Sequence, residues 1–202
     1  MNADRLWQDC AGCGALGLEA RAEYSDTVVT CLSCGHEERR RRLPFFSVSG
    51  ATCTGKSSVC RRLWKLLPEC VALDGDLLWD AALWDAPGVF YARWLGVAAQ
   101  ISQAGRPVVL CTAAIPQAWE ESPSRILVAD VHMLTLVCDE DVLLERLRGR
   151  GRPPDPKAPV EETLSFNRWL RANVEPAFDT TSASPDDTAA QVAAWVRGRL
   201  TG

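Results

Sequence analysis

The residues with the clearest chemistry form a glycine-rich loop that ends in a lysine and a serine. The loop matches the pattern G-x-x-x-x-G-K-S at every fixed position and consists of Gly50, Ala51, Thr52, Cys53, Thr54, Gly55, Lys56 and Ser57. In loops of this pattern, backbone amides and the N-terminus of the following helix bind phosphate oxygens, and the lysine adds a full positive charge. The serine hydroxyl, here that of Ser57, binds Mg²⁺. The loop, with Ser58 behind it, therefore predicts a site for magnesium and a nucleoside triphosphate such as ATP.

The segments on either side of this loop have the pattern that phosphate binding requires. Residues 45–49 form an apolar run that predicts a strand, and residues 56–67 predict a helix. The alternative, a glycine turn that contains a lysine by chance, fits this context poorly. The strand expected at 107–112 ends without a carboxylate, and no N-K-x-D sequence occurs. Both absences favour a small kinase over a motor ATPase or a GTPase switch.

Two carboxylates follow the next expected strand, which covers residues 69–73. Asp74 and Asp76 flank Gly75, and the carboxyl ends of strands in an open parallel sheet line the ligand crevice. One carboxylate there can take the proton of an acceptor hydroxyl as it attacks the γ-phosphate, and the other can hold Mg²⁺ through water. We favour Asp76 for the acceptor and Asp74 for the metal. The alternative is a turn with two solvated carboxylates.

Aromatic residues gather in the segment after the two aspartates. Trp79, Trp84, Phe90, Tyr91 and Trp94 lie within 16 residues of one another. Most of them are expected to pack in the core. Trp79 and Tyr91 are candidates for stacking on a planar acceptor such as a nucleobase, and Arg93 is the best polar candidate for binding it.

Arginines at every second position mark a candidate lid. Arg146, Arg148, Arg150 and Arg152 alternate with other residues before Pro153. A lid that closes its arginines over the transferring phosphate would stabilise the charge on its oxygens and exclude water. The alternative is a solvated helix end, where cations also interact well with the helix dipole. We accept this alternative for Arg148 and expect the other three to belong to the lid.

Two C-x-x-C-G sequences near the N-terminus predict a metal site. Cys10 and Cys13 form one pair, Cys31 and Cys34 form the other, and 17 residues separate the pairs. Four thiolates hold zinc tetrahedrally with no open position, so the zinc is expected to be structural. His36 is not needed as a ligand. A redox role is the alternative, and two matched copies on so short a segment argue against it.

Composition limits the function classes. The 202 residues are 47% hydrophobic with a net charge of −4, which argues against a protein that coats nucleic acid by bulk charge. An odd count of nine cysteines without a visible export signal indicates a reducing cytoplasm. No apolar run is long enough for a membrane helix, so no membrane partner is expected. The oligomeric state is not encoded in any recognisable pattern.

The chain divides into residues 1–43, expected to be a zinc ribbon, and residues 44–202, where strands and helices alternate as in an α/β fold. Strands are expected at 45–49, 69–73, 107–112, 132–138 and 177–180. Helices are expected at 56–67, 77–84, 90–104, 139–149, 160–173 and 186–199.

From residue 45 onward the sequence resembles the small P-loop kinases, the group of nucleoside monophosphate kinases, shikimate and gluconate kinases and chloramphenicol phosphotransferase. The resemblance rests on the phosphate loop, the D-G-D after the next strand, E-R-L-R-G-R-G-R-P as a lid, and F-D-T-T at 178–181 before a last helix. It implies a five-stranded parallel sheet in the order 2-3-1-4-5, flanked by helices. It also implies that residues 180–185 lie beside the adenine.

Two functions remain open on the sequence. The first is an ATP- and Mg²⁺-dependent kinase that acts on a small acceptor such as a nucleoside, a nucleotide or a related metabolite. The second is a nucleotide-regulated adaptor that binds RNA or protein through the ribbon. The arginine run at 39–42 could contact RNA, but the neighbouring Glu37 and Glu38 favour a solvated linker instead.

Overall fold

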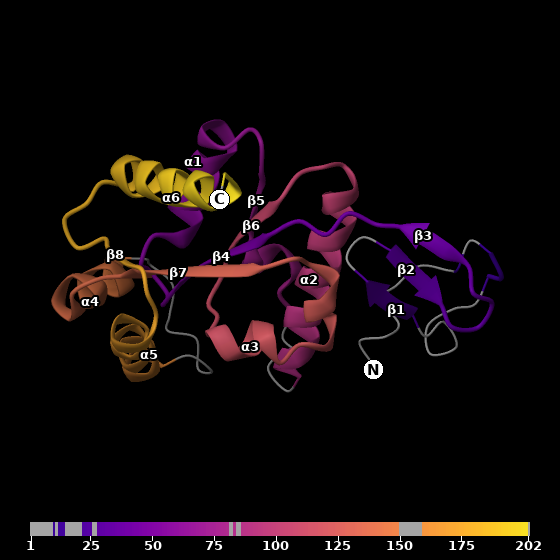
Figure 1. Cartoon of the computed structure of the whole chain (residues 1–202). Helices are drawn as coiled ribbons and strands as arrows, with labels where there is room; N and C mark the ends of the chain where they lie inside the picture. Colours follow the sequence, from indigo (N-terminus) through magenta and orange to yellow (C-terminus); the bar gives the residue numbers. More distant parts are fainter. Residues whose placement is uncertain are drawn as a thin grey trace. The chain divides into compact units, whose positions relative to one another are not determined.

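The computed structural model describes residues 10, 12–14, 22–25, 28–80, 83, 86–149 and 159–201. Figure 1 labels the helices and strands along the chain. The chain falls into two compact units, one of residues 1–45, 78–108 and 117–131, and the other of residues 46–77, 109–116 and 132–202. The first unit thus combines the expected ribbon with segments of the α/β part. A domain boundary after residue 43 stays a prediction.

The second unit contains a five-stranded parallel sheet, except for the first residues of three strands, which are Phe45, Val108 and Val131. Its strands are β4 (Phe45–Gly50), β5 (Val71–Asp74), β6 (Val108–Cys111), β7 (Val131–Val137) and β8 (Ala177–Asp179). They are arranged β5-β6-β4-β7-β8. Counted along the chain from β4, this order is 2-3-1-4-5, which confirms the fold class expected from the sequence.

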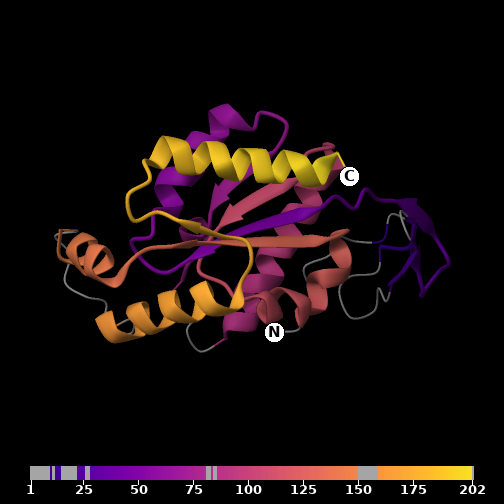
Figure 2. The ribbon, with the colours of Figure 1, turned by 60° about the vertical axis from the view of Figure 1, so that its left-hand side comes forward.

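Helices cover both faces of this sheet (Figure 2). On one face, α1 (Lys56–Leu66) and α6 (Pro185–Leu200) share a core with Leu134 and Leu136 of β7. On the other face, α5 (Val160–Asn173) packs Leu170 against Val137. Side chains alternate between the two faces of a strand, so the central strand β4 is buried along its whole length. α4 (Glu140–Gly149) lies next to α5.

The start of α6 shows how local sequence sets a helix boundary. The Ser184 hydroxyl accepts a hydrogen bond from the Asp187 amide at 3.1 Å, and Pro185 occupies the first helical position. Asp186 and Asp187 lie in the first turn, where negative charge stabilises a helix. The helix therefore begins where the sequence predicts, within one residue.

The first unit contains an antiparallel sheet of β1 (Ala22–Ser25), β2 (Val28–Cys31) and β3 (Glu37–Arg39), in that order. It also contains α2 (Pro87–Gln103), most of α3 (Pro116–Glu120) and the 3₁₀ helix η5 (Pro123–Leu127). In the part of the chain that the structure describes, no helix is long and apolar enough to cross a membrane.

The expected helix at 77–84 is wrong for the residues that are described there. A single 3₁₀ turn, η3 (Gly75–Leu78), follows β5, and Trp79 and Asp80 lie outside any helix. The Asp74 carboxylate accepts the Asp76 amide at 3.2 Å and so closes a tight turn at the strand end. Such local side-chain bonds compete with a regular helix.

Candidate active site and metal centre

The phosphate loop is shaped by its two fixed glycines. A Cβ atom at Gly50 would lie 2.4 Å from the Thr54 hydroxyl and 2.9 Å from the Leu136 carbonyl oxygen, so no side chain fits there. Gly55 precedes α1 with φ at 102°, a conformation that side chains disfavour. The Thr54 hydroxyl also donates to the Ala51 carbonyl at 2.9 Å. These contacts hold the loop tight in front of the helix N-terminus.

Cys53 has a positive φ in this loop although it is not a glycine. Its φ of 68° lies in the left-handed region that residues other than glycine seldom adopt. The side chain is half-buried and packs against the cluster of Cys138, Leu143 and Leu164. This packing accounts for a residue with a Cβ atom at a position where glycine would be less strained.

Lys56 lies at the centre of the site. Its ammonium group donates to the carbonyl oxygens of Gly50 and Ala51, both at 2.8 Å. Desolvation lowers the pKa of Lys56 to about 8, and the negative charges of Asp76 and Asp74 act in the opposite direction. The structure therefore brings the predicted lysine and both predicted aspartates into one electrostatic environment.

Thr112 packs closely against Gly75 in the turn that carries the two aspartates. A Cβ atom at Gly75 would lie 2.4 Å from the Thr112 hydroxyl and 2.6 Å from its Cβ atom. The Thr112 amide in turn donates to the Val48 carbonyl at 3.1 Å, in the strand that leads to the phosphate loop. Asp76 is exposed, whereas Asp74 is half-buried. This difference is consistent with an acceptor role for Asp76 and a metal role for Asp74, and both roles stay predictions.

Arg146 has partners that the lid hypothesis did not anticipate. Its guanidinium donates to the carbonyl oxygens of Thr180 at 2.7 Å and of Thr181 at 3.4 Å. In this structure it therefore holds the loop after β8. Its contribution to a lid stays a prediction, and Arg150 and Arg152 lie outside the described residues.

Thr180 and Asn167 are two candidate positioning residues to which the sequence assigned no role of their own. The buried Thr180 hydroxyl lies 3.1 Å from the Thr54 carbonyl oxygen and 3.0 Å from that of Val137, so it joins the β8 loop to the phosphate loop. The buried Asn167 side chain bonds both the amide and the carbonyl of Cys138 at the end of β7. The signal for Asn167 was a polar residue on the apolar face of α5. Thr180 lies in the F-D-T-T sequence and in the segment 180–185 that the resemblance places beside the adenine, but neither pattern indicated its contacts with Thr54 and Val137.

The acceptor candidates on the aromatic segment belong to the first unit. Trp79 and Phe90 contact each other edge to face with centroids 5.7 Å apart, and Tyr91 lies 4.8 Å from Trp119. Trp94 is fully buried and is therefore a core residue. Trp79 is 44% exposed, and Tyr91 and Arg93 are half-buried. Trp84 lies outside the described residues, and the acceptor roles of the others stay predictions.

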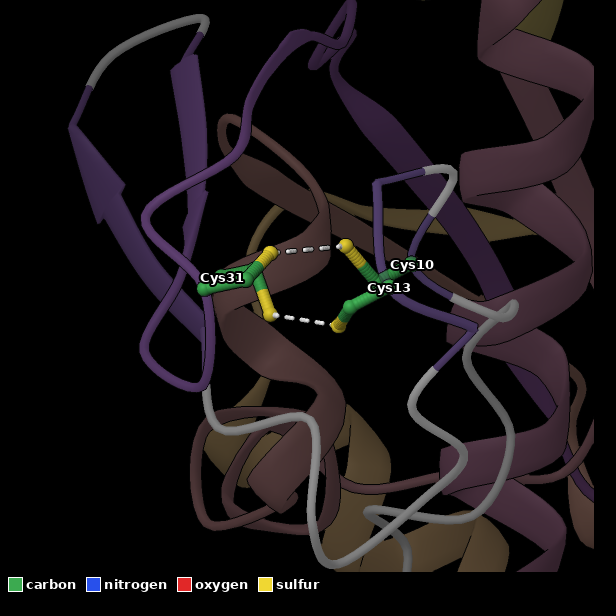
Figure 3. A group of neighbouring side chains, drawn as sticks. Cys10, Cys13 and Cys31 are labelled. Atoms are coloured by element: carbon green, nitrogen blue, oxygen red, sulfur yellow. Dashed lines mark hydrogen bonds between the residues drawn. The ribbon is translucent and has the colours of Figure 1, made fainter.

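The four predicted zinc ligands come together (Figure 3). The sulfur atoms of Cys10, Cys13, Cys31 and Cys34 lie within 4.8 Å of one another, and the labelled side chains point toward a common centre. Gly14 and Gly35 follow the two pairs with φ of 69° and 72°, as expected for tight turns. Their amides donate at 2.7 Å to the carbonyls of Cys10 and Cys31. The two turns are therefore equivalent.

The pKa values of two thiols in this cluster are shifted in opposite directions. The amides of Cys34 and Ser33 donate to the Cys31 sulfur and lower the pKa of its thiol to about 7. The His36 amide acts in the same direction on Cys34, but the neighbouring sulfur atoms and desolvation outweigh it and raise that pKa to about 12. Several thiolates this close together repel one another unless a metal ion compensates their charge. All nine cysteines lie in the described part of the chain, and none forms a disulfide.

No family model matches the sequence, and neither does any curated protein. Solved structures match it in fold. The tunicamycin resistance protein of Deinococcus radiodurans is 22% identical, with a TM-score of 0.54 over 77% of this chain and 96% of that one. Shikimate kinase of Acinetobacter baumannii is 20% identical, with a TM-score of 0.52 over 78% of this chain and 94% of that one. The YorR protein of Bacillus subtilis, solved in complex with phosphorylated GDP, is 15% identical, with a TM-score of 0.54 over 78% and 98%. The α/β part of the chain therefore has the fold of the P-loop kinases.

Proposed function

We propose that this protein is an ATP- and Mg²⁺-dependent kinase that transfers the γ-phosphate to a small acceptor. The observation that carries the proposal is the grouping of Lys56 with Asp74 and Asp76 at the carboxyl ends of β4 and β5. A phosphate loop alone would fit many nucleotide-binding proteins. Two carboxylates whose charges act on its lysine would supply the additional groups that transfer to an acceptor requires.

The residues divide the chemistry between them. The loop amides and Lys56 bind the β- and γ-phosphates, and they stabilise the charge that accumulates as the bond between the γ-phosphorus and the bridging oxygen breaks. Ser57 and Asp74 would hold the magnesium ion, Asp74 through water, and the ion would neutralise charge on the phosphates. Asp76 takes the proton from the acceptor hydroxyl as its oxygen bonds to the γ-phosphorus, and ADP leaves. If the acceptor group is a phosphate, it attacks as an anion and no proton is transferred.

We further propose that the acceptor is a nucleoside, a nucleotide or a related metabolite. Trp79 and Tyr91 offer aromatic faces for a planar group, and Arg93 offers a cation. Stacking of a base on an aromatic side chain stabilises its binding by about 1–3 kcal/mol.

The four cysteines are proposed to bind one structural zinc ion. Four thiolates complete a tetrahedral zinc site, and the two glycine-relieved turns present them in pairs. Zinc then supplies folding free energy to a segment with few large aliphatic residues.

A screen of nucleosides, nucleotides and related metabolites for ATP consumption, with products identified by mass, tests the proposed activity. Lys56→Ala should abolish turnover with the fold intact, and Asp76→Asn should lower kcat with little change in nucleotide affinity. The exposed Lys65 on the same helix provides a matched control, since Lys65→Ala should have no effect. Wild-type turnover in Lys56→Ala would refute the mechanism. Salt-dependent RNA binding without any phosphoryl transfer would support an adaptor instead.

A further inference from the structure

The linker, residues 40–45, leads from the ribbon into β4, and although Arg41 is exposed, hydrogen bonds attach the linker to other segments of the first unit. The Arg41 amide donates to the Gln103 side-chain oxygen at 3.1 Å, and the Gln103 side-chain nitrogen donates back to the Arg41 carbonyl at 3.0 Å. Gln103 is the last residue of α2. One side chain thus satisfies both backbone groups of Arg41, as a neighbouring strand would.

Further contacts extend this attachment along the linker. Arg42 donates to the Val128 carbonyl at 2.9 Å, and the Leu43 carbonyl accepts the Ala129 amide at 3.2 Å. The Phe45 amide donates to the Asp130 carbonyl at 2.8 Å. These bonds resemble the pairing of two extended strands.

Aromatic contacts continue from the linker to Tyr91, in the first half of α2. The Phe45 ring lies edge to face on Trp119 at 4.9 Å, and Trp119 lies on Tyr91 of α2 at 4.8 Å. The linker therefore contacts α2 directly at Gln103 and through Trp119 at Tyr91. All these residues belong to the first unit.

The metal site lies only a few residues from this attachment. β3 pairs with β2, where Arg39 lies opposite Val28, and β2 ends at the zinc-ligand candidate Cys31. The Cys31 amide also donates to the His36 carbonyl at 2.9 Å, which ties β3 to the second cysteine turn. Loss of the metal would release β2 and β3 together, because four thiolates supply most of the order of this segment. The linker would then fray from its N-terminal end toward Arg41.

We propose that the metal-loaded ribbon braces α2 through the linker, so that metal loading sets the affinity for the acceptor and leaves the affinity for the nucleotide unchanged. The acceptor part rests on the proposed function, because Tyr91 and Arg93 of α2 are its acceptor candidates. The nucleotide-binding residues belong to the second unit. The mechanical part, the coupling between the metal and α2, stands on the linker contacts alone.

Hydrogen–deuterium exchange on the full chain tests the coupling without any activity assay. Zinc-loaded protein is compared with protein treated with a zinc chelator, with metal content measured in both. Chelation should raise exchange in the last turn of α2 and at the Ala129 amide, which donates to Leu43, by about three- to tenfold for each hydrogen bond lost. Exchange in β6 should not change.

Substitution of Gln103 distinguishes coupling between the metal and α2 from destabilisation of the whole chain. Gln103→Ala removes both bonds to Arg41, so exchange at the end of α2 should already be raised with zinc bound, and chelation should add little. Gln191→Ala, an exposed glutamine on α6, is the matched control and should behave as the wild type. Unchanged α2 exchange after chelation would overturn the proposal, as would an equal increase in Gln103→Ala or an increase throughout the chain.

Kinetics then test the acceptor part. With the acceptor found by the metabolite screen, chelation and Gln103→Ala should each raise the KM for the acceptor and leave the KM for ATP constant. A rise in the KM for ATP alone would overturn this part. If no acceptor is phosphorylated at all, the proposed function fails, and the exchange measurements still decide whether the metal braces α2.

Discussion

Replacing Gly75 by alanine tests whether the geometry of the aspartate turn is needed for phosphoryl transfer. The new methyl group would lie 2.4 Å from the Thr112 hydroxyl and 2.6 Å from its Cβ atom, about 1 Å inside ordinary contact. Thr112 cannot move away easily, because it is buried and its amide is bonded to Val48. The turn must therefore shift by about 1 Å, and both carboxylates shift with it.

The magnitude of the effect follows from that displacement. Overpacking of this kind costs about 1–3 kcal/mol of stability. A misplacement of about 1 Å between reacting groups can lower the rate about 100-fold. We therefore expect kcat to fall by about 10- to 100-fold, while the dissociation constant for the nucleotide changes less than about threefold because the phosphate loop is untouched.

Steady-state kinetics, nucleotide titration and thermal unfolding together measure these effects. Gly198→Ala in α6 is the matched control: apart from its chain neighbours and the backbone of its own helix, nothing lies within 4 Å of the added methyl group, and alanine should stabilise the helix by up to about 1 kcal/mol. The reasoning is refuted if Gly75→Ala keeps wild-type kcat. It is also refuted if nucleotide affinity and kcat fall together, since the turn would then act through the nucleotide.

Three further predictions concern the charge of Lys56, the β8 loop and the metal. Because the pKa of free Lys56 is lowered to about 8, nucleotide affinity should fall as the pH rises above 8, by up to tenfold per unit; titrations at pH 7 and 9.5 measure this, and Lys56→Met should abolish the dependence. In the unfolded chain this lysine has a pKa near 10.4, so between pH 8 and 10.4 the unfolded chain binds more protons at this position than the folded chain does. The free energy of unfolding should therefore increase as the pH rises through that range. Thr180→Val removes the hydroxyl that contacts the carbonyl oxygens of Thr54 and Val137 and the guanidinium of Arg146. It should lower the free energy of unfolding in urea by about 1–2 kcal/mol and weaken ATP binding several-fold. Unchanged ATP binding would show that the β8 loop is not part of the nucleotide site. Metal analysis should find one zinc per chain, and Cys31→Ser should abolish it while Cys70→Ser should not.

The strands were predictable because the sequence of a buried parallel strand is a short, uninterrupted run of apolar residues. The expected strand at 107–112 became β6 over Val108–Cys111, and 132–138 became β7 over Val131–Val137. The grouping of the cysteines was also predictable, because the two pairs repeat one local turn. In both cases the signal lies within a few residues.

The contacts that could not be predicted join residues that are far apart in the sequence. Arg41 meets Gln103 across 62 residues and Arg42 meets Val128 across 86, so the arginine run looked like a solvated charge cluster. Thr180 reaches Thr54 across 126 residues, and nothing in F-D-T-T marks that contact. The short helices α3 and η5 were missed as well, although Pro116 and Pro123 stand at their first positions, where proline favours a helix start.

The pairing of Leu43 and Phe45 with residues 129–130 bears on how the chain can be shortened. A protein that starts at residue 44, where composition alone would cut it, loses the Arg42 and Leu43 contacts and leaves the carbonyl of Val128 and the amide of Ala129 without these partners. An exposed extended segment of that kind invites pairing with another molecule. A start at residue 40 would keep Arg41, Arg42 and Leu43, the residues that make these bonds, while removing all four zinc ligands. The longer fragment should therefore stay monodisperse at concentrations at which the shorter one self-associates.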